Sequence, residues 1–426
     1  MNLVPLLLSL PTLLQTEMTE RGIPGAALAI IKDGQIIYSA GVGVSSTETN
    51  EPVRAEMLFR AGSTTKMMTA AALLQLSLDG KIGLDEPIGN RVPTLLAALR
   101  GLTVNQLLSH TSGLIPDTGF NGSHDDSGLA ANIMSWDEKR FFTKPGRVYS
   151  YSNHGYALAG YLVEKLSGKP FADAVREMVF RPAGMGRTTF RPLEAMTYPI
   201  SQGHNEKSAV VRPSADHTGF WPAGSMFTNV LELARFADGF MKQQFPDKRL
   251  DGRVVAGLTA PRVALPTNPT AHYGYGVIVE QWRGVTRWSH SGSREGYGSM
   301  LIMAPEQNLA IALMTNRSGA NLPRTREKIQ EALLPVGPAA AAPTEVSFAA
   351  GEMERMAGVY ARGAQKAELT VREGKLWLAT PGGPAEVKRL SDGSVKAHGQ
   401  TGWFSLLEGG RMQYLHVSGL PYERVP

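Results

Sequence analysis

The stretch AGSTTKMMTAAALLQLSLDG, residues 61–80, decides our interpretation of the fold. Apart from three uncharged polar residues, it continues after the lysine to position 78 as a run of apolar, helix-forming residues, and a glycine follows at position 80. Such a run predicts a buried helix over residues 65–79. Its first turn nevertheless carries Lys66, three residues after Ser63. Because a buried ammonium needs a partner or loses its proton, this lysine requires an explanation.

The spacing of Ser63 and Lys66 suggests one explanation. Residues three apart on a helix lie on the same face, so the lysine points back toward the serine within hydrogen-bonding reach. Apolar surroundings favour the neutral amine, which can take the proton from a serine hydroxyl. The alternative is a lysine near a helix end whose ammonium reaches solvent. The spacing alone does not decide, since a chain of this length contains about one or two such pairs by chance.

Composition places the whole chain among ordinary globular proteins. It has 426 residues, enough for one large domain and a smaller one, and is 42% apolar and 19% charged. The net charge of +5 is spread along the chain without a Lys/Arg cluster, which argues against nucleic-acid binding. The absence of cysteine excludes thiol catalysis, thiolate metal sites and disulfides.

The N-terminal sequence MNLVPLLLSLPTLLQ is apolar and uncharged, as a signal peptide would be. However, it lacks a basic start and a small-residue cleavage site, and it contains Pro5 and Pro11. We therefore favour a first helix that packs on the fold and runs to Gly22, and a cytoplasmic location, with a secreted or periplasmic one as the alternative. No run of 18 apolar residues predicts a membrane span.

Strand patterns occur at both ends of the first 334 residues. Residues 25–42 predict a hairpin around the Asp33-Gly34 turn. Helical patterns and long loops follow, and strand patterns return only after residue 272. This order predicts an α+β fold with one antiparallel sheet built from both ends of the domain and a helical region inserted between them. The predicted helices are 65–79, 103–109, 154–167, 228–241 (with Thr228 as N-cap) and 321–334, and the late strands are 273–282, 285–290, 298–304 and 309–315.

The last part of the chain has a different pattern. Residues 335–347, PVGPAAAAPTEVS, form a Pro/Ala-rich stretch that we interpret as a linker. After it come short alternating segments separated by turn residues, which predict a small all-β, barrel-like unit over residues 348–426. The predicted domains are therefore 1–334 and 348–426.

A second group of polar residues lies in YSYSNHGYALAG, just ahead of the helix expected from residue 154. Tyr151 beside a cationic amine could give up its proton more easily, which suits general acid/base work on a leaving group. Asn153 offers an acceptor and a donor for a substrate amide. The alternative is a helix N-cap preceded by a core tyrosine. We expect Tyr149 and Tyr156 to be packing residues.

A third group lies in WSHSGSREGYGSM. We expect His290 and the two residues after it to end one strand, so that their backbone lies along the edge of the sheet. Gly292 would permit close approach of a substrate, and the next amide, that of Ser293, could pair with the amide of Ser63 as donors to an oxyanion. His217 also begins a His-x-Gly sequence, but it lies in a proline-flanked loop without a strand on either side.

Taken together, these motifs resemble those of the penicillin-recognising serine hydrolases, the group that contains class C β-lactamases, family VIII carboxylesterases and D-aminopeptidases. The resemblance covers roughly residues 13–334. It is supported by the stretches GIPGAALAIIKDG, LLSHTSGL, SNHGYALAGYLVEKLSGKP, RPAGMGRT and WPAGSMFTNVLELARF. The motif set is specific for this superfamily and not for one substrate.

The resemblance implies a role for each motif residue. Ser63 would be the acylated nucleophile and Lys66 its activating base. Tyr151 would protonate the leaving group, and Asn153 would orient the acyl side chain. The amides of Ser63 and Ser293 would form the oxyanion hole. Whether Lys66 or Tyr151 first deprotonates the serine stays open at this point.

The chain departs from the family pattern at one position. β-Lactamases and many cell-wall peptidases carry Lys-Thr-Gly where this chain has His-Ser-Gly, starting at His290. The lysine provides a cation for a substrate carboxylate, whereas histidine is mostly neutral at pH 7. Arg294 could compensate if it points into the site. The His-x-Gly form resembles that of D-aminopeptidases and esterases in the group.

These observations predict a serine hydrolase that forms an acyl-enzyme and cleaves a small ester, or an amide or peptide of a D-amino acid. Two alternatives are an acyltransferase using the same acyl-enzyme and a penicillin-binding sensor, DD-peptidase or weak β-lactamase. No cofactor or metal is implied, because the nine histidines show no ligand spacing such as His-x-x-x-His. The expected partner is a small-molecule ester, amide or peptide substrate, and the oligomeric state is left open.

Overall fold

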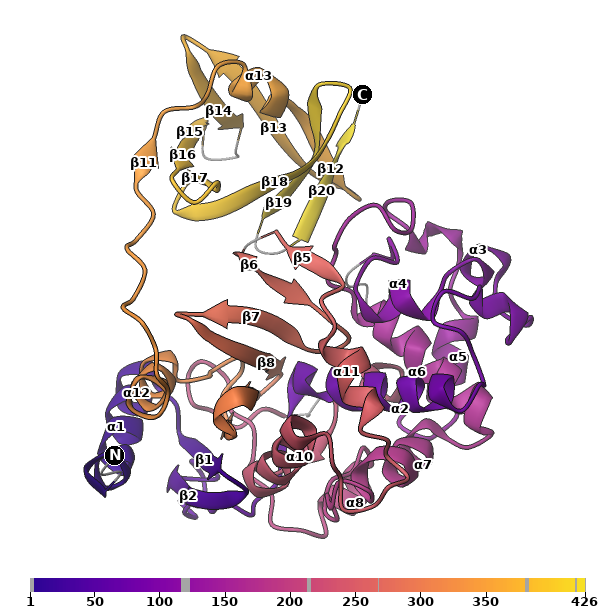
Figure 1. The fold of residues 1–426 in the computed structure, drawn as a ribbon, viewed down its shortest axis with the longest axis vertical. Coiled ribbons are helices and arrows are strands. Elements are labelled where there is room, and N and C mark those ends of the chain that lie inside the picture. The colour runs from indigo at the N-terminus through magenta and orange to yellow at the C-terminus, as the bar shows by residue number, and fades with distance from the viewer. Residues whose placement is uncertain are drawn as a thin grey trace.

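A large antiparallel sheet organises the first part of the computed structural model, which describes residues 4–115, 123–212, 216–266, 268–379, 383–417 and 420–425 (Figure 1). Its strand order is β2-β1-β10-β9-β8-β7-β6-β5, so the early hairpin pairs with the late strands. The prediction of one sheet built from both ends is confirmed. Its strands are β1 (Gly25–Lys32), β2 (Gln35–Gly43), β5 (Val263–Leu265), β6 (Asn268–Tyr273), β7 (Ile278–Trp282), β8 (Val285–Arg294), β9 (Tyr297–Ala304) and β10 (Leu309–Thr315).

The strand β1, which pairs with β2 on one side and β10 on the other, shows that the sheet is covered on both faces. Successive side chains of a strand point to opposite faces. Ala27, Ala29 and Ile31 belong to the core that the helical region shares, whereas Leu28 and Ile30 belong to the core beneath α1 (Val4–Arg21) and α12 (Pro323–Leu333). The continuous apolar run of β1 therefore reflects burial on both faces.

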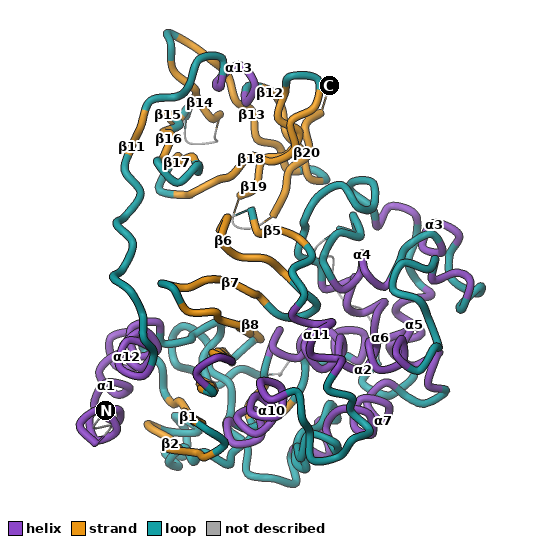
Figure 2. Tube along the Cα trace, in the orientation of Figure 1, coloured by secondary structure: helices purple, strands orange, loops and turns teal. Residues whose placement is uncertain are grey.

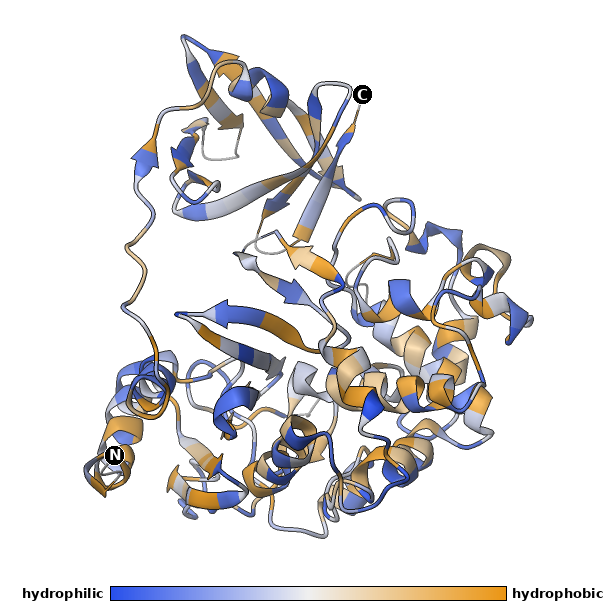
Figure 3. Ribbon diagram, in the orientation of Figure 1, coloured by the Kyte–Doolittle hydropathy of each residue, from blue (hydrophilic) through white to orange (hydrophobic). Residues whose placement is uncertain are grey.

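The inserted region is mainly helical, as expected, and lies beside the sheet (Figure 2). Its central helices α2 and α6 pack against each other and are largely apolar (Figure 3). A short two-stranded sheet, β3 (Phe59–Arg60) and β4 (Phe227–Thr228), also lies in this region. The helices are α2 (Lys66–Leu78), α3 (Ala97–Arg100), α4 (Val104–Leu108), α5 (Gly128–Met134), α6 (Asn153–Ser167), α7 (Phe171–Val175), α8 (Pro192–Ala195), α9 (Trp221–Gly224), α10 (Val230–Lys242) and α11 (Arg253–Thr259).

One predicted strand, 273–282, is wrong in its extent. The chain turns between β6 and β7, and Gly276 adopts a φ of +73°. A side chain at Gly276 would lie 2.8 Å from the carbonyl of Lys66, so this turn packs directly on the first residue of α2. The alternation of apolar residues in the sequence does not reveal this close approach.

The predicted cap of α10 is also wrong by one residue. The side chain of Asn229, not of Thr228, accepts the hydrogen bond from the backbone N–H of Glu232, at 2.9 Å. Thr228 is used elsewhere, because it pairs with Phe59 between β4 and β3 and its hydroxyl lies 2.7 Å from that of Thr188. Threonine and asparagine are both good N-caps. Because Thr228 is held in the short strand β4, the next residue, Asn229, caps the helix.

The N-terminal stretch forms α1, as predicted. Its residues Leu10, Leu14 and Met18 are buried in the core that α1 shares with the large sheet and α12. The carboxylate of Glu17 is also buried and accepts hydrogen bonds from the N–H and hydroxyl of Thr325, both at 2.8 Å. These bonds tie α1 to the first turn of α12. Among the described residues, we find no helix with the length and apolar character that crossing a membrane requires.

After α12 the chain runs without helix or strand to a separate, curled sheet of ten strands (Figure 1). This confirms the prediction of a small barrel-like β-unit, to which the structure adds one short helix, α13 (Glu352–Met356). The domain limits 1–334 and 348–426 remain a prediction. The strands are β11 (Glu345–Val346), β12 (Gly358–Arg362), β13 (Gln365–Arg372), β14 (Lys375–Ala379), β15 (Ala385–Glu386), β16 (Lys388–Leu390), β17 (Val395–Ala397), β18 (Gln400–Glu408), β19 (Arg411–Val417) and β20 (Leu420–Val425).

Candidate active site

Ser63 and Lys66 lie where the chain enters α2. Gly62–Thr65 forms one turn of 3-10 helix that continues directly into α2, so the two side chains lie on the same face. The Lys66 Nζ is 3.2 Å from the Ser63 Oγ. Lys66 is completely buried, whereas Ser63 is half-buried. The structure thus rejects the alternative of a lysine that reaches solvent.

The surroundings of the Lys66 ammonium are polar and not apolar, which corrects our expectation. Its Nζ donates to the Oδ1 of Asn153 and to the carbonyl of Ala223, both at 2.7 Å. Asn153 begins α6 and Ala223 lies in α9, so three separate helices meet at this one group. Buried charge is tolerated when it has such acceptors.

This arrangement of Lys66 suits both of its protonation states. An ammonium has three protons, and the oxygens of Asn153, Ala223 and Ser63 can accept all three. A neutral amine would keep its two protons for Asn153 and Ala223, which can only accept at these oxygens. Its lone pair would then face the Ser63 hydroxyl. A proton can therefore pass between Oγ and Nζ without rearrangement of the other two bonds.

Tyr151 lies beside the same lysine. Its ring centroid is 4.7 Å from the Lys66 Nζ, a distance at which the ring attracts a cation. The loop that carries Tyr151 is fixed at the start of α6, where the Ser152 hydroxyl accepts the backbone N–H of Gly155 at 3.2 Å. The structure therefore brings Ser63, Lys66, Tyr151 and Asn153 together. Tyr149 and Tyr156 are buried, as expected of packing residues.

His290 is also near this group, but its ring is enclosed. Only 3% of the residue is exposed, and its ring centroid is 6.4 Å from that of Tyr151. Nδ1 lies 2.6 Å from the carbonyl oxygen of Ser291, so Nδ1 carries the proton and Nε2 accepts from the hydroxyl of Tyr273, at 2.9 Å. Burial and the nearby charge of Lys66 lower the pKa of His290 to about 3. The imidazole is neutral at pH 7.

The His-Ser-Gly sequence does not end its strand, contrary to our expectation. The strand β8 continues to Arg294, paired with β9 throughout, but β7 pairs with it only as far as Ser289. The other side of the last five residues of β8 faces the turn that carries Ser63. The predicted strand end at His290 is therefore wrong, but in the part of the chain that the structure describes, the backbone that follows it has no strand partner on the β7 side, as an edge would.

Two glycines allow β8 to approach the Ser63 turn. A side chain on Gly292 would lie 1.9 Å from the carbonyl oxygen of Ala61, and one on Gly62 would lie 2.6 Å from the amide nitrogen of Ser293. Gly62 also has a φ of +52°, which favours glycine. The amide of Ser63 belongs to a first helical turn, whose N–H groups have no acceptor within the helix. The two amides proposed for an oxyanion therefore lie on adjoining backbones.

Arg294 lies at the end of β8 and packs its guanidinium over the ring of Phe220, with the Cζ 4.4 Å from the centroid. Burial and the charge of Arg60 lower the pKa of Arg294 to about 10. Arg60 itself forms a buried ion pair with Asp216. His217, which begins the other His-x-Gly sequence, follows Asp216 in the chain. It precedes a 3-10 turn and does not belong to a strand, as expected.

The sequence analysis did not single out three residues that contact this site. The carbonyl of Ala223, the ring of His110 and the hydroxyl of Tyr273 all contact residues of the site. Ala223 and His110 lie in stretches that supported the family resemblance, WPAGSM and LLSHTSGL. That resemblance was the available signal, because neither a backbone carbonyl nor a lone buried histidine has a recognisable spacing.

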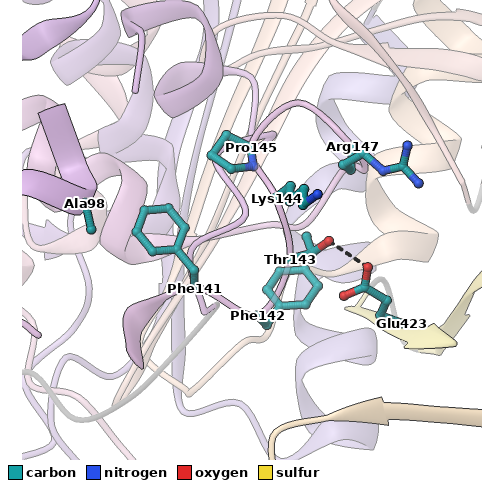
Figure 4. Close-up of a pocket in the computed structure, with 8 residues that line it drawn as sticks. All are labelled: Ala98, Phe141, Phe142, Thr143, Lys144, Pro145, Arg147 and Glu423. Carbon is teal, nitrogen blue, oxygen red and sulfur yellow. Dashed lines mark hydrogen bonds between the residues drawn. The ribbon is translucent and has the colours of Figure 1, made fainter. Parts of the chain in front are cut away.

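A cavity of about 710 Å³ lies between the inserted region and the curled sheet (Figure 4). Ser63, Lys66 and Tyr151 do not line it. Within the described part of the chain, no three His, Asp or Glu side chains are grouped as metal ligands. The residues lining the cavity are Ala98, Phe141, Phe142, Thr143, Lys144, Pro145, Arg147 and Glu423.

An antiparallel sheet beside a buried Ser-x-x-Lys helix defines the serine β-lactamase-like superfamily. Comparison with known families agrees, because the model of the Beta-lactamase family matches residues 10–334. The chain belongs to this family. In sequence, it is 29% identical over 321 residues to Penicillin-binding protein 4 of Amycolatopsis lactamdurans, covering 70% of this chain and 82% of the relative. It is 25% identical over 322 residues to the putative penicillin-binding protein PbpX of Bacillus subtilis, covering 74% and 76%.

Solved structures extend the comparison to the curled sheet. The crystal structure of SurE with D-Leu is similar over 98% of this chain and 99% of that chain, with a TM-score of 0.77 and 25% identity. D-amino acid amidase from Ochrobactrum anthropi is similar over 76% of this chain and 98% of that chain, with a TM-score of 0.63 and 24% identity. The complete architecture of this chain, and not only its first part, thus occurs in another protein.

Proposed function

We propose that the protein is a serine hydrolase that forms an acyl-enzyme at Ser63 and cleaves a small ester, or an amide or peptide bond of a D-amino acid. The observation that carries this proposal is the Ser63–Lys66 pair at 3.2 Å, with the lysine held by two further acceptors. A buried lysine with this freedom to exchange a proton with a serine suits nucleophilic catalysis.

Acylation begins when the Ser63 Oγ bonds to the substrate carbonyl carbon. The hydroxyl proton passes to the Lys66 Nζ or to Tyr151, and the choice between these two bases stays open. The carbonyl oxygen becomes an oxyanion, which accepts hydrogen bonds from the amides of Ser63 and Ser293. Collapse of this intermediate breaks the bond to the leaving group, which takes a proton from Tyr151. If Lys66 was the base, it then passes the serine proton to Tyr151 beside it and is neutral again; if Tyr151 was the base, it reacted as a phenolate and hands on the proton that it took from the serine.

Deacylation reverses these roles. A water molecule gives a proton to the base and attacks the ester carbonyl, and the second tetrahedral intermediate is stabilised by the same amides. Its collapse releases the carboxylic acid and returns the proton to the Ser63 Oγ. An acyltransferase would differ only in using an alcohol or amine in place of water.

The choice of substrate rests on His290. A neutral, enclosed imidazole provides no cation for a carboxylate at the position where related peptidases and β-lactamases carry lysine. We therefore expect neutral esters and amides to be preferred over penicillins. The names of the similar structures, which mention D-Leu and a D-amino acid amidase, support D-configured substrates. His290 would act by holding Tyr273 and the edge of β8.

A second candidate is a penicillin-binding DD-peptidase. The names of the sequence relatives favour it, and D-alanine carboxypeptidase AmpC from Burkholderia cenocepacia is a similar structure, with a TM-score of 0.65 and 23% identity. In this case Arg294 would have to supply the cation for the substrate carboxylate, after leaving its position over Phe220.

A substrate panel tests both candidates. The wild type and Ser63→Ala would be assayed with p-nitrophenyl acetate, D- and L-aminoacyl p-nitroanilides, a D-Ala-D-Ala peptide and a penicillin. We expect Ser63-dependent turnover of the ester and of the D-anilide, with little turnover of the other substrates. Turnover confined to the D-Ala-D-Ala peptide would favour the DD-peptidase, and turnover that Ser63→Ala retains would contradict both.

A further inference from the structure

His110 lies outside the group of residues that the reaction uses, yet it holds Tyr151 from both sides. The backbone N–H of Ser150 donates to the carbonyl oxygen of His110 at 2.7 Å. The backbone N–H of Ser152 donates to the Nδ1 of the same residue at 3.0 Å. The two residues that flank Tyr151 are thus both bound to one histidine.

The ring of His110 also lies against the ring of Tyr151, with centroids 4.3 Å apart and an interplanar angle of 34°. This combination requires an unusual backbone. His110 has a φ of +61°, in the left-handed region that non-glycine residues seldom adopt. The backbone conformation lets the carbonyl and the side chain of one residue reach the same segment, and such strain persists only when the surrounding structure imposes it.

The hydrogen bonds fix the protonation state of His110. Nδ1 accepts from Ser152, so the proton of the neutral ring is on Nε2. That nitrogen is buried and has no hydrogen-bond partner among the described residues, and it lies in a cluster of aromatic rings that includes Tyr156 and Tyr273. Burial and the charges of Lys66 and His290 hold the pKa of His110 well below its usual value. The ring is therefore suited to accept a bond and not to exchange protons.

We propose that His110 is a positioning residue that sets the place of the Tyr151 phenol beside Lys66, through its bonds to Ser150 and Ser152 and its contact with the ring. This inference rests on the proposed function. If Tyr151 protonates the leaving group, loss of His110 should matter most for substrates whose leaving group needs a proton.

Two variants separate the acceptor from the ring. His110→Phe keeps an aromatic ring against Tyr151 but removes the Nδ1 acceptor. His110→Asn replaces that acceptor with an amide oxygen and tolerates a positive φ, but removes the ring. A matched control is His204→Phe. His204 is an equally buried histidine that accepts a backbone N–H, from Thr47 at 3.2 Å, and it bonds to Asn316, away from Tyr151.

The readout is the ratio of kcat/KM for an alkyl ester to that for the p-nitrophenyl ester of the same acid. A p-nitrophenolate leaves without protonation, whereas an alkoxide requires it. Because general acid catalysis contributes about 100- to 10,000-fold, we expect His110→Phe to lower the ratio by at least about tenfold. His110→Asn should lower it less than about threefold, and His204→Phe should leave it unchanged. Thermal unfolding of each variant shows how far its fold is weakened.

Failure of this inference can be distinguished from failure of the proposed function. If the wild type is active only with Ser63 intact but His110→Phe retains the wild-type ratio, the role of His110 is wrong. Equal losses for both esters in His110→Phe and His110→Asn would also overturn it, since they would indicate packing alone. If His110→Phe does not fold, His110→Ala, which removes both the acceptor and the ring, takes its place: a ratio lowered by at least about tenfold supports the role, and a wild-type ratio overturns it. Activity that survives in Ser63→Ala would instead contradict the proposed function.

Discussion

At the scale of single residues, the site depends on how Lys66 is held. A buried amine with one acceptor would be costly, whereas this one has three oxygens within 3.2 Å, contributed by Ser63, Asn153 and Ala223. The bond from Lys66 uses the Oδ1 of Asn153, which we had expected to bind substrate. Asn153 therefore has a role in holding the base that the sequence did not indicate.

We predict that Lys66→Met nearly abolishes turnover, by about 1,000-fold or more, because methionine fills a similar volume without a proton acceptor. Ser63→Ala should be at least as severe, and the double variant little worse than either single one, since the two residues act as a unit. Steady-state rates on a p-nitrophenyl ester measure this, with thermal unfolding as the control for the fold. Retention of more than about a tenth of the activity by Lys66→Met would exclude it as the base.

A second prediction concerns acid stability and His290. Its pKa is lowered in the folded protein, to about 3, so between that value and about 6.5 the unfolded chain binds the proton more readily. The contribution of His290 to stability is therefore present above about pH 6.5 and is lost as the pH falls, by at most about 1.4 kcal/mol per pH unit.

We expect His290→Phe to lose less stability than the wild type between pH 6.5 and 4.5. Urea unfolding at several pH values in this range gives the slopes, and the wild type should take up about one proton more on unfolding than the variant. Equal slopes for the two proteins would show that His290 is not held neutral by the fold.

Residue types, spacing and the family resemblance together singled out Ser63, Lys66, Tyr151 and the region of His290, which the structure brings close together. Their catalytic roles stay a prediction. They could not indicate which atoms hold the lysine, because the carbonyl of Ala223 comes from a distant helix and a carbonyl has no sequence signature. They also could not show that the His290 ring is enclosed, since its partner Tyr273 belongs to a strand whose end the sequence misplaced.

At the scale of elements, the site is an approach of two backbones, the last residues of β8 and the turn that begins α2. Gly292, Gly62 and Gly276 lie at such approaches, and a side chain at any of them would meet backbone atoms within 3 Å. The helix α2 was predictable because its run of mostly apolar, helix-forming residues is long. The turn before β7 was not predictable, because it follows from the close packing of Gly276 on the backbone of Lys66, and no local sequence pattern indicates that contact.

We predict that Gly292→Ala reduces kcat by at least about tenfold. The new methyl group would lie 1.9 Å from the carbonyl oxygen of Ala61, so β8 must move away from the Ser63 turn, and the amides of Ser63 and Ser293 would separate. Loss of one oxyanion donor costs about 100- to 1,000-fold in other hydrolases.

The control for this variant is Gly186→Ala, where a side chain would meet no atom within 4 Å. It should retain the wild-type kcat. Rates at saturating ester for the three proteins provide the comparison. A Gly292→Ala enzyme with the wild-type kcat would mean that the strand does not supply an oxyanion donor.

At the scale of the whole molecule, the curled sheet contacts the segment that leads to Tyr151. The hydroxyl of Thr143 lies 3.0 Å from the carboxylate of Glu423 (Figure 4). The hydroxyl of Tyr414 lies 2.8 Å from that of Thr143 and 3.1 Å from the same carboxylate. Thr143 is buried and lies eight residues before Tyr151. The second sheet thus borders the loop of the candidate acid/base, a contact that no local sequence pattern could predict.

We predict that Thr143→Val and Tyr414→Phe each lower kcat severalfold and that their effects are not additive, with a coupling energy of about 0.5–1.5 kcal/mol. The reason is that both side chains form one hydrogen-bonded group with Glu423. A double-mutant cycle on kcat measures the coupling. The exposed Arg147–Glu408 pair at the same contact should contribute little, so Glu408→Ala, which breaks this pair, is the control. Additive effects, or an equal effect of Glu408→Ala, would contradict a role for the buried group.

The central claim, an acyl-enzyme at Ser63, is tested most directly by intact mass spectrometry. The protein would be mixed with a slowly hydrolysed p-nitrophenyl ester and quenched in acid within seconds, and the modified peptide would then be sequenced. We predict a mass increase equal to one acyl group, on Ser63 alone, that disappears as the ester is consumed and does not form in Ser63→Ala. Turnover of the ester without any such adduct, or an adduct on another residue, would contradict the account.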